Sequence, residues 1–380
     1  MKHRYSFSVI RTALTTLTLS FSLSGFASAD SFSDVYQDFQ AAYQAKDFTH
    51  SARLAEQAWQ LGKTKFGNNS EQAIKLHHSY ANMLIEADQY SDGLNEYKTV
   101  ADDYEEKWGS KSASYISALT SILDKTASIQ TSAGVPSSTL IKFNNRLTRQ
   151  IVEGINNVEF TTEKARASAY LFAAKTVIQA APFTLSSATL EHFFTDAQHH
   201  ALANWGEADL HSVQTLFYSA MISEMRHRNE EAIERYQRII SIFDNLTDFS
   251  HPMELQAHAR LVNIYENKDQ SGAATEHCRA IGSMTPWDDS QEPTPLYRLD
   301  PKYPVQYARR GREGSATLSY TIDKNGVVTD IQVEDDSNGK AFADASVKAL
   351  SQWRFAPKFE QGEPVVSPRQ TVQLDFLIGS

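Results

Sequence analysis

The sequence predicts a mainly α protein in which a helical solenoid is followed by a small α+β domain. Three observations lead to this fold class. Apolar residues recur at helical spacing over residues 30–282, related segments return every 42 residues, and the hydrophobic period changes to two after residue 314. A chain of 380 residues is also too long for one ordinary core, so several domains are expected.

The first 29 residues have the pattern of an export signal. Lys2 and Arg4 precede an apolar stretch, and Ala27 and Ala29 form a small-residue cleavage site before Asp30. The apolar stretch is rich in Thr and Ser, which favours a cleaved signal over a permanent membrane anchor. We therefore expect residues 1–29 to be the signal peptide of an exported protein.

Charge and cysteine content narrow the possible functions. The formal net charge is −10, and the segment from Tyr297 to the end carries eleven basic and eleven acidic residues, so the excess negative charge belongs to the helical part. Nucleic acid is therefore not an expected partner. The single cysteine, Cys278, excludes an intrachain disulfide; its helical setting favours a small apolar residue over the alternative of a thiol nucleophile.

The helical region repeats with a period of 42 residues. Phe48 aligns with Tyr90, Lys65-Phe66-Gly67 with Lys107-Trp108-Gly109, Ala220 with Val262, and Ala232 with Ala274. Each unit predicts two antiparallel helices joined by a short turn, such as Asp88-Gln89-Tyr90. The pattern resembles the longer form of the tetratricopeptide repeat, and it implies a solenoid of about five helix pairs over residues 30–282 with a degenerate middle.

A linker and a second domain are expected after the repeats. Residues 283–300 contain Pro286, Pro293 and Pro295, which no helix would tolerate, and are interpreted as the linker. Residues 301–380 then predict an antiparallel sheet with one covering helix. Its elements are a hairpin turning at Asn325-Gly326 with Val327, Thr329, Ile331 and Val333 on one side of the second strand, a helix with Phe342, Ala349 and Leu350 on one face, and a last strand Thr371–Ile378.

The motifs of this domain point to a known family. They are Tyr303-Pro304, Glu313-Gly314, Asn325-Gly326-Val327-Val328, Trp353-Arg354-Phe355-Ala356-Pro357 and Gly362-Glu363-Pro364-Val365. Their order and spacing resemble the C-terminal domain of the TonB energy-transducer family over about a fifth of the chain. The resemblance implies a domain that pairs a short peptide of an outer-membrane transporter with an exposed sheet edge and transmits force from the inner membrane.

The last strand is the candidate peptide-binding edge. Its residues are Thr371, Val372, Gln373, Leu374, Asp375 and Phe376. Pairing through backbone groups gives affinity with little demand on side chains; the alternative is that a helix, a loop or a second copy covers this strand. Further candidate partner contacts are Tyr303, Pro304, Arg309 and Arg310, whose arginines either steer an acidic peptide or are simply solvated.

Two functions follow from this combination. In the first, the chain is a TonB-like periplasmic coupling protein that supports energy-dependent transport, with the repeats docking an inner-membrane motor-linked partner. In the second, it is an envelope assembly scaffold that uses both domains only as docking surfaces. The family's membrane anchor and Pro-rich spacer are not recognisable here, which motivates the second; an inner-membrane anchored chain facing the periplasm is the alternative location.

No site of catalysis, cofactor binding or metal binding is expected. His77-His78 and His192, His199 and His200 lack the i,i+4 spacing that brings two imidazoles onto one metal, and are interpreted as solvated helix residues. No phosphate-binding glycine loop, nucleophile elbow or Cys-x-x-Cys motif occurs in the sequence. The chain is therefore expected not to be an enzyme, and to have no small-molecule substrate.

Overall fold

The computed structural model describes residues 31–129, 137–180, 187–246, 251–284, 293, 295–336, 339–360 and 362–378. They belong to two compact units, Met1–Gly93 and Leu94–Ser380. The predicted signal peptide lies outside the described residues. Within the described ranges, no helix is long and apolar enough to cross a membrane.

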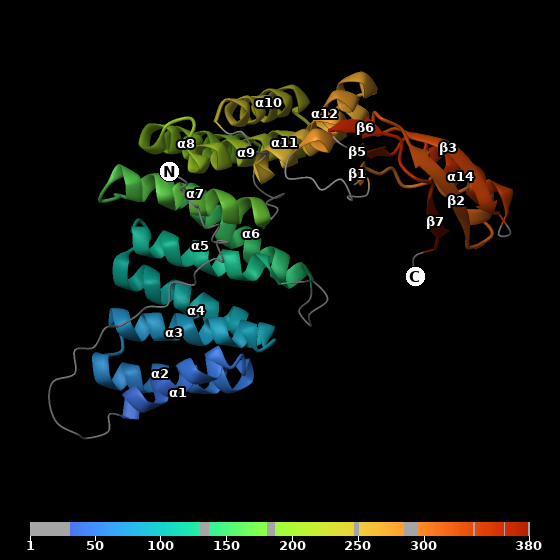
Figure 1. Ribbon diagram of the computed structural model, residues 1–380. Helices are drawn as coiled ribbons and strands as arrows, with labels where there is room; N and C mark the ends of the chain where they lie inside the picture. Colours follow the sequence, from blue (N-terminus) through green and yellow to red (C-terminus); the bar gives the residue numbers. More distant parts are fainter. Residues whose placement is uncertain are drawn as a thin grey trace, which may run out of the picture. The chain divides into compact units, whose positions relative to one another are not determined.

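The repeat region consists of helices that alternate as first and second members of six consecutive pairs among the described residues, one pair more than expected (Figure 1). The first helices are α1 (Ser31–Gln44), α3 (Glu71–Glu86), α5 (Ala113–Ala127), α7 (Glu163–Gln179), α9 (Leu210–Met225) and α11 (Pro252–Asn267). The second helices are α2 (Phe48–Phe66), α4 (Tyr90–Trp108), α6 (Ser137–Gly154), α8 (Ser187–Trp205), α10 (Asn229–Leu246) and α12 (Ser271–Ser283). A short 3-10 turn, Ile155–Asn157, follows α6.

The 42-residue period appears in the backbone as well as in the sequence. Helices α2 and α4 begin 42 residues apart, as do α9 and α11. The turn after α1, α3, α9 and α11 repeats too, because one residue there takes a left-handed conformation that reverses the chain. These residues are Lys46 (φ 59°), Asp88 (φ 60°), His227 (φ 59°) and Asp269 (φ 57°).

Helix starts are fixed by polar side chains at the same period. The hydroxyls of Ser70 and Ser112 accept hydrogen bonds from the backbone N–H groups of Ala73 and Tyr115, each at 3.1 Å. Such caps satisfy one of the N–H donors that a helix leaves without an internal partner, and each contributes about 1 kcal/mol. Capping therefore repeats along with the apolar pattern.

The C-terminal domain contains the predicted antiparallel sheet and covering helix. Strands β2 (Gly314–Ile322), β3 (Val328–Asp335) and β7 (Gln370–Phe376) form a three-stranded sheet in the order β3-β2-β7. Helix α14 (Lys340–Leu350) packs on β2 and β3. The core between them is formed by Leu318, Tyr320, Ile322, Val328, Leu350, Trp353 and Phe355.

Strand β3 departs from the simple alternation expected for it. The prediction placed Val327, Thr329, Ile331 and Val333 on one side, but the buried residue is Val328, with Ile331 partly buried three positions later. Asp330 between them has φ 51°, and the pairing with β2 is irregular between Ser319 and Thr321. This irregularity shifts the side-chain phase along the strand, which a period-two pattern cannot show.

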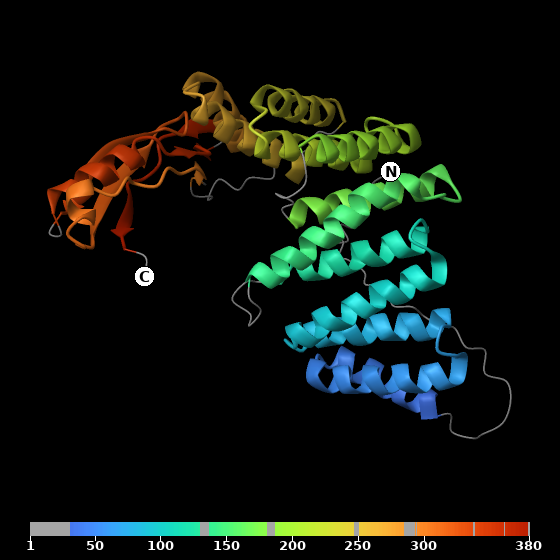
Figure 2. The ribbon, with the colours of Figure 1, turned by 180° about the vertical axis from the view of Figure 1, so that it is seen from behind.

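Two small sheets complete the domain and lie against the last repeat. Strand β1 (Pro295–Tyr297), within the range expected as linker, pairs with β4 (Arg354–Phe355), and β5 (Lys358–Glu360) pairs with β6 (Glu363–Val365). Helix α11 contacts β1, and α12 contacts β5 and β6, a neighbourhood visible from both sides (Figures 1 and 2). The short helix α13 (Val305–Ala308) precedes β2.

Candidate functional site

Strand β7 lies at one edge of the three-stranded sheet, where the predicted peptide-binding residues fall. It pairs with β2 from Gln370 to Phe376, and its other side has no partner strand among the residues that the structure describes. Thr371, Gln373 and Asp375 are exposed, whereas Phe376 is buried, so the side chains alternate as expected. The strand ends at Phe376, two residues before the predicted end.

Tyr303 supports the C-terminal end of this strand. Its hydroxyl oxygen lies 2.8 Å from the carbonyl oxygen of Arg312 and 3.4 Å from that of Phe376. Its ring meets the rings of Phe342 and Phe376 edge to face, with centroids 5.9 and 5.5 Å apart. Tyr303 thus links the segment before β2 to β7, and its contact with a partner remains a prediction.

The other predicted contact residues lie close by in sequence, around α13. Pro304 occupies the N-cap position of this helix, and Arg309 and Arg310 are exposed in the turn after it. The neighbouring Arg312 covers the ring of Tyr307 at 4.7 Å from the centroid. Because Tyr303 contacts both Arg312 and Phe376, the basic turn and the end of β7 are brought together.

The opposite edge of the sheet, β3, is less suited to pairing. Asp330 interrupts its ladder in a left-handed conformation, and Glu334 and Asp335 near its end are exposed. An irregular, charged edge disfavours addition of another strand. Arg369 also reaches across from the start of β7 and donates a hydrogen bond to the carbonyl oxygen of Asp330 at 3.1 Å. Of the two edges, β7 is therefore the better candidate.

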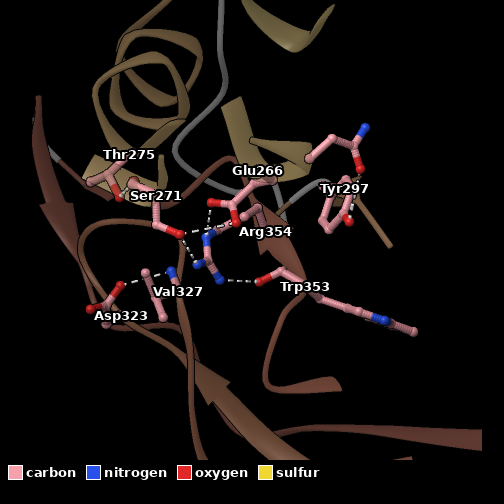
Figure 3. A network of polar contacts seen from close by, with 9 residues as sticks. Glu266, Ser271, Thr275, Tyr297, Asp323, Val327, Trp353 and Arg354 are labelled. Atoms are coloured by element: carbon pink, nitrogen blue, oxygen red, sulfur yellow. Dashed lines mark hydrogen bonds and ion pairs between the residues drawn. The ribbon is translucent and has the colours of Figure 1, made fainter. Parts of the chain in front are cut away.

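A polar network joins the C-terminal domain to the last helix pair. Arg354 of β4 donates from Nε to Glu266 of α11 at 2.7 Å and from Nη2 to the hydroxyl of Ser271 at 3.2 Å (Figure 3). The Ser271 hydroxyl in turn donates to the second carboxylate oxygen of Glu266 at 3.1 Å. The third contact of the guanidinium is the carbonyl oxygen of Trp353, at 3.0 Å. All the acceptors of Arg354 are thus supplied within the chain.

This junction was not predicted from the sequence. Arg354 was recognised there only as part of a family motif, and Glu266 has the appearance of an ordinary helix-end carboxylate. The side chains of Arg354 and Glu266 are only 9% and 7% exposed, which distinguishes them from the surface pairs of the repeats. A signal was available in principle, because an arginine between the apolar residues Trp353 and Phe355 requires a buried anionic partner.

Cys278 and His77 have structural roles. Cys278 is fully buried in α12, and burial raises the pKa of its thiol to about 12, so it is not a reactive thiolate. His77, expected to be solvated, is instead 1% exposed and stacks on Trp59 with centroids 3.9 Å apart. Within the described ranges, no three His, Cys, Asp or Glu residues are grouped as metal ligands.

Known proteins match the C-terminal domain. Residues 300–377 match the family described as Gram-negative bacterial TonB protein C-terminal. Two curated relatives come from Pseudomonas aeruginosa: Protein tonB2, 33% identical over 81 residues, and Protein TonB, 33% identical over 82 residues. These segments cover 21% and 22% of this chain, and 30% and 23% of the two relatives. The chain thus spans less than a third of either relative.

Solved structures with helical repeats cover much of the chain at low similarity. The TPR-like repeats of a putative kinesin light chain from Podosopora anserina have a TM-score of 0.43 and 10% identity, covering 57% of this chain and 97% of that one. The assembly chaperone of RpL4 has a TM-score of 0.38 and 14% identity, covering 66% of this chain and 89% of its own. Similarity of this degree carries no inference about function.

Proposed function

Because residues 300–377 carry a TonB C-terminal domain behind tetratricopeptide-like helix pairs, we propose that this chain is a TonB-like periplasmic coupling protein. Its C-terminal domain binds a short peptide of an outer-membrane transporter or of another envelope partner, and so supports energy-dependent transport. The observation that carries this proposal is that one side of β7, at the end of the matched segment, has no partner strand within the part of the chain that the structure describes.

The chemistry of β7 fits peptide addition. A strand at a sheet edge presents N–H and C=O groups that can bond an extended peptide, and affinity then comes mainly from the backbone. The outward side chains of β7 are uncharged at Thr371 and Gln373, with a single carboxylate at Asp375. The basic turn at Arg309 and Arg310 would attract an acidic peptide to the same end of the sheet.

Location and partners form the finer part of the proposal. The export signal predicted at residues 1–29 supports a periplasmic location, and an inner-membrane anchored chain is the alternative. If the signal is cleaved, force has to reach the chain through a separate motor-linked protein. The helical repeat is the proposed docking surface for that protein, because such solenoids present extended binding surfaces.

The test is a binding titration of the full chain with transporter N-terminal peptides. Successive N–H groups of a strand point in opposite directions. Of the two replacements Gln373→Pro and Leu374→Pro, one therefore removes an N–H donor that faces β2, and the other removes an N–H donor that faces the open edge. We expect the replacement that removes the edge-facing donor to abolish peptide binding in a chain that still folds. Gln373→Ala, which changes only an exposed side chain, should leave affinity within about twofold. No binding at millimolar peptide would overturn the proposal.

The second candidate function is an envelope assembly scaffold. It is favoured by the predicted cleavage of the export signal and by the helical repeat, which offers a second docking surface. A strain without the gene separates the two functions, because coupling predicts reduced uptake of a scarce transporter ligand. Unchanged uptake together with impaired envelope assembly would favour the scaffold.

A further inference from the structure

The last helix pair presents an apolar face beyond which no further repeat follows among the described residues. On α12, Ala274, Cys278 and Ile281 are all 0% exposed. In a solenoid each unit buries its apolar face against the next, so the final unit needs a cap with a polar outer surface. Something other than a seventh helix pair must therefore cover α12.

The C-terminal domain provides this cover. A Cβ added at Gly282 of α12 would lie 2.5 Å from the ring of Phe359 and 2.9 Å from the carbonyl oxygen of Pro357, so these backbones are in close approach. A Cβ added at Gly326, in the turn between β2 and β3, would lie 3.4 Å from the Cβ of Cys278. Leu296 and Tyr297 of β1 pack on the cluster formed by Val262, Ala274 and Cys278.

Ion pairs also connect each of the later helix pairs to the part of the chain that follows it. Acidic side chains on α8, α9 and α10, or just after α8, meet a basic side chain 31 to 38 positions further along, in the next helix pair. These pairs are Glu191 with Arg228, Glu207 with Arg238, Glu224 with Arg260, and Glu230 with Lys268. Glu266 of α11 instead meets Arg354 of the C-terminal domain, which occupies the place of the next pair.

We infer that the C-terminal domain is the terminal cap of the solenoid, held by α11 and α12 through β1, β4, β5 and the β2–β3 turn. A pull on β7 then reaches the repeat helices across this packed interface, because β2 and the Arg354 strand connect the edge to α11. Residues 285–292, which connect α12 to β1 along the chain, then do not have to transmit this force. The inference is independent of what β7 binds.

The first test asks whether the interface holds without the chain connection. A protease recognition sequence is inserted within residues 285–292 of the full chain, and the cleaved protein is analysed by gel filtration. We expect both fragments to elute together at the volume of the intact chain in moderate salt. Separate elution of two folded fragments would overturn the inference, since it would reduce the C-terminal domain to a tethered module.

The second test uses Cys278, the only thiol in the chain, as a reporter of undocking. Under native conditions we expect alkylation by iodoacetamide to be slow, and Glu266→Gln or Arg354→Met to accelerate it at least tenfold. The matched control is Arg369→Met, which removes the partner of exposed Asp330 within the same domain. Circular dichroism identifies the variants that remain folded. If Arg354→Met does not fold, the alkylation rate of Glu266→Gln alone is compared with that of the control. Equal rates in the folded variants and the control would contradict the inference.

Discussion

Glu266 and Arg354 are 88 residues apart in sequence and share a 2.7 Å hydrogen bond between carboxylate and guanidinium. Both side chains are buried, and Ser271 satisfies the remaining carboxylate oxygen (Figure 3). A buried ion pair contributes little net stability compared with an apolar replacement, but breaking it leaves one charge without compensation. We therefore expect the pair to specify where the C-terminal domain docks more than it adds to stability.

Removing one member of this pair should be more harmful than removing both. Arg354→Met or Glu266→Gln should each lower the free energy of unfolding by about 3 to 5 kcal/mol, because the other partner stays buried. The double variant should lose less than the sum of the two single variants. Chemical denaturation of the four proteins measures this coupling. The exposed pair Arg369 and Asp330 is the control, with a coupling of at most about 1 kcal/mol. Additive losses at both pairs would argue against a buried, coupled contact.

A second prediction concerns Gly326 in the turn between β2 and β3. Its φ is 75°, and an added Cβ would lie 2.0 Å from the carbonyl oxygen of Phe355. Gly362 has a similar φ of 81° with nothing within 4 Å of the added Cβ, so it isolates the conformational cost. We expect Gly362→Ala to cost about 1 kcal/mol and Gly326→Ala considerably more. Thermal unfolding compares them, and equal losses would show that the close approach is relaxed.

A third prediction concerns pH. The Nδ1 atoms of His258 and His277 lie 2.8 Å apart between α11 and α12, and Tyr265 stacks on His277. Burial lowers the pKa of His258 to about 4 and also lowers the pKa of His277, which the carboxylate of Glu276 opposes. The unfolded chain then binds more protons than the folded chain below about pH 6.5. Stability is complete above that pH and declines as pH falls toward 4.

For His258 the loss between pH 7 and pH 4 amounts to about 3 kcal/mol. Denaturation midpoints across this range measure it. His258→Gln should remove the share of the slope that belongs to His258, while a share remains from His78, whose pKa burial also lowers to about 4. The exposed His192 provides a control substitution. A slope that His258→Gln and His277→Gln together leave unchanged would assign the pH dependence to other groups.

A fourth prediction addresses the basic turn. Replacing Arg309 and Arg310 by Gln should slow association with an acidic peptide several-fold at low ionic strength and have little effect at high salt, because long-range attraction is screened. Stopped-flow fluorescence gives the rate. Lys324→Gln, at the β2–β3 turn, is the matched control. Equal rates for both variants would leave the two arginines as solvated surface residues.

The sequence predicts the fold well where local patterns repeat. Helix starts, turns and caps recur at 42 residues because each unit reverses the chain in the same way, as the left-handed residues Lys46 and Asp88 show. The helix pairs in the middle of the repeat region have sequences that do not align at this period. The predicted number of helix pairs was therefore one too low. Alternation in β2 was predictable, whereas the phase of β3 changes at Asp330, which carries no turn signal in the sequence.

The candidate site was predictable only in part. The edge position of β7 follows from the family pattern, and the structure places the strand there. The docking of the domain on α11 and α12 depends on contacts between distant residues, such as Gly282 with Phe359, which no local pattern encodes. Proline content favoured a linker over residues 283–300, although Pro295 begins a paired strand at a sheet edge, where proline is tolerated.

Hydrogen exchange of the full chain, with and without a transporter N-terminal peptide, tests peptide binding at β7 most directly. The account predicts slower exchange of the edge-facing amides between Thr371 and Asp375, with β3 unchanged. Because α11 and α12 hold the domain in both states, their amides should also stay unchanged. Protection confined to β3 or to the repeat helices, with the amides of β7 exchanging as before, would contradict the central claim.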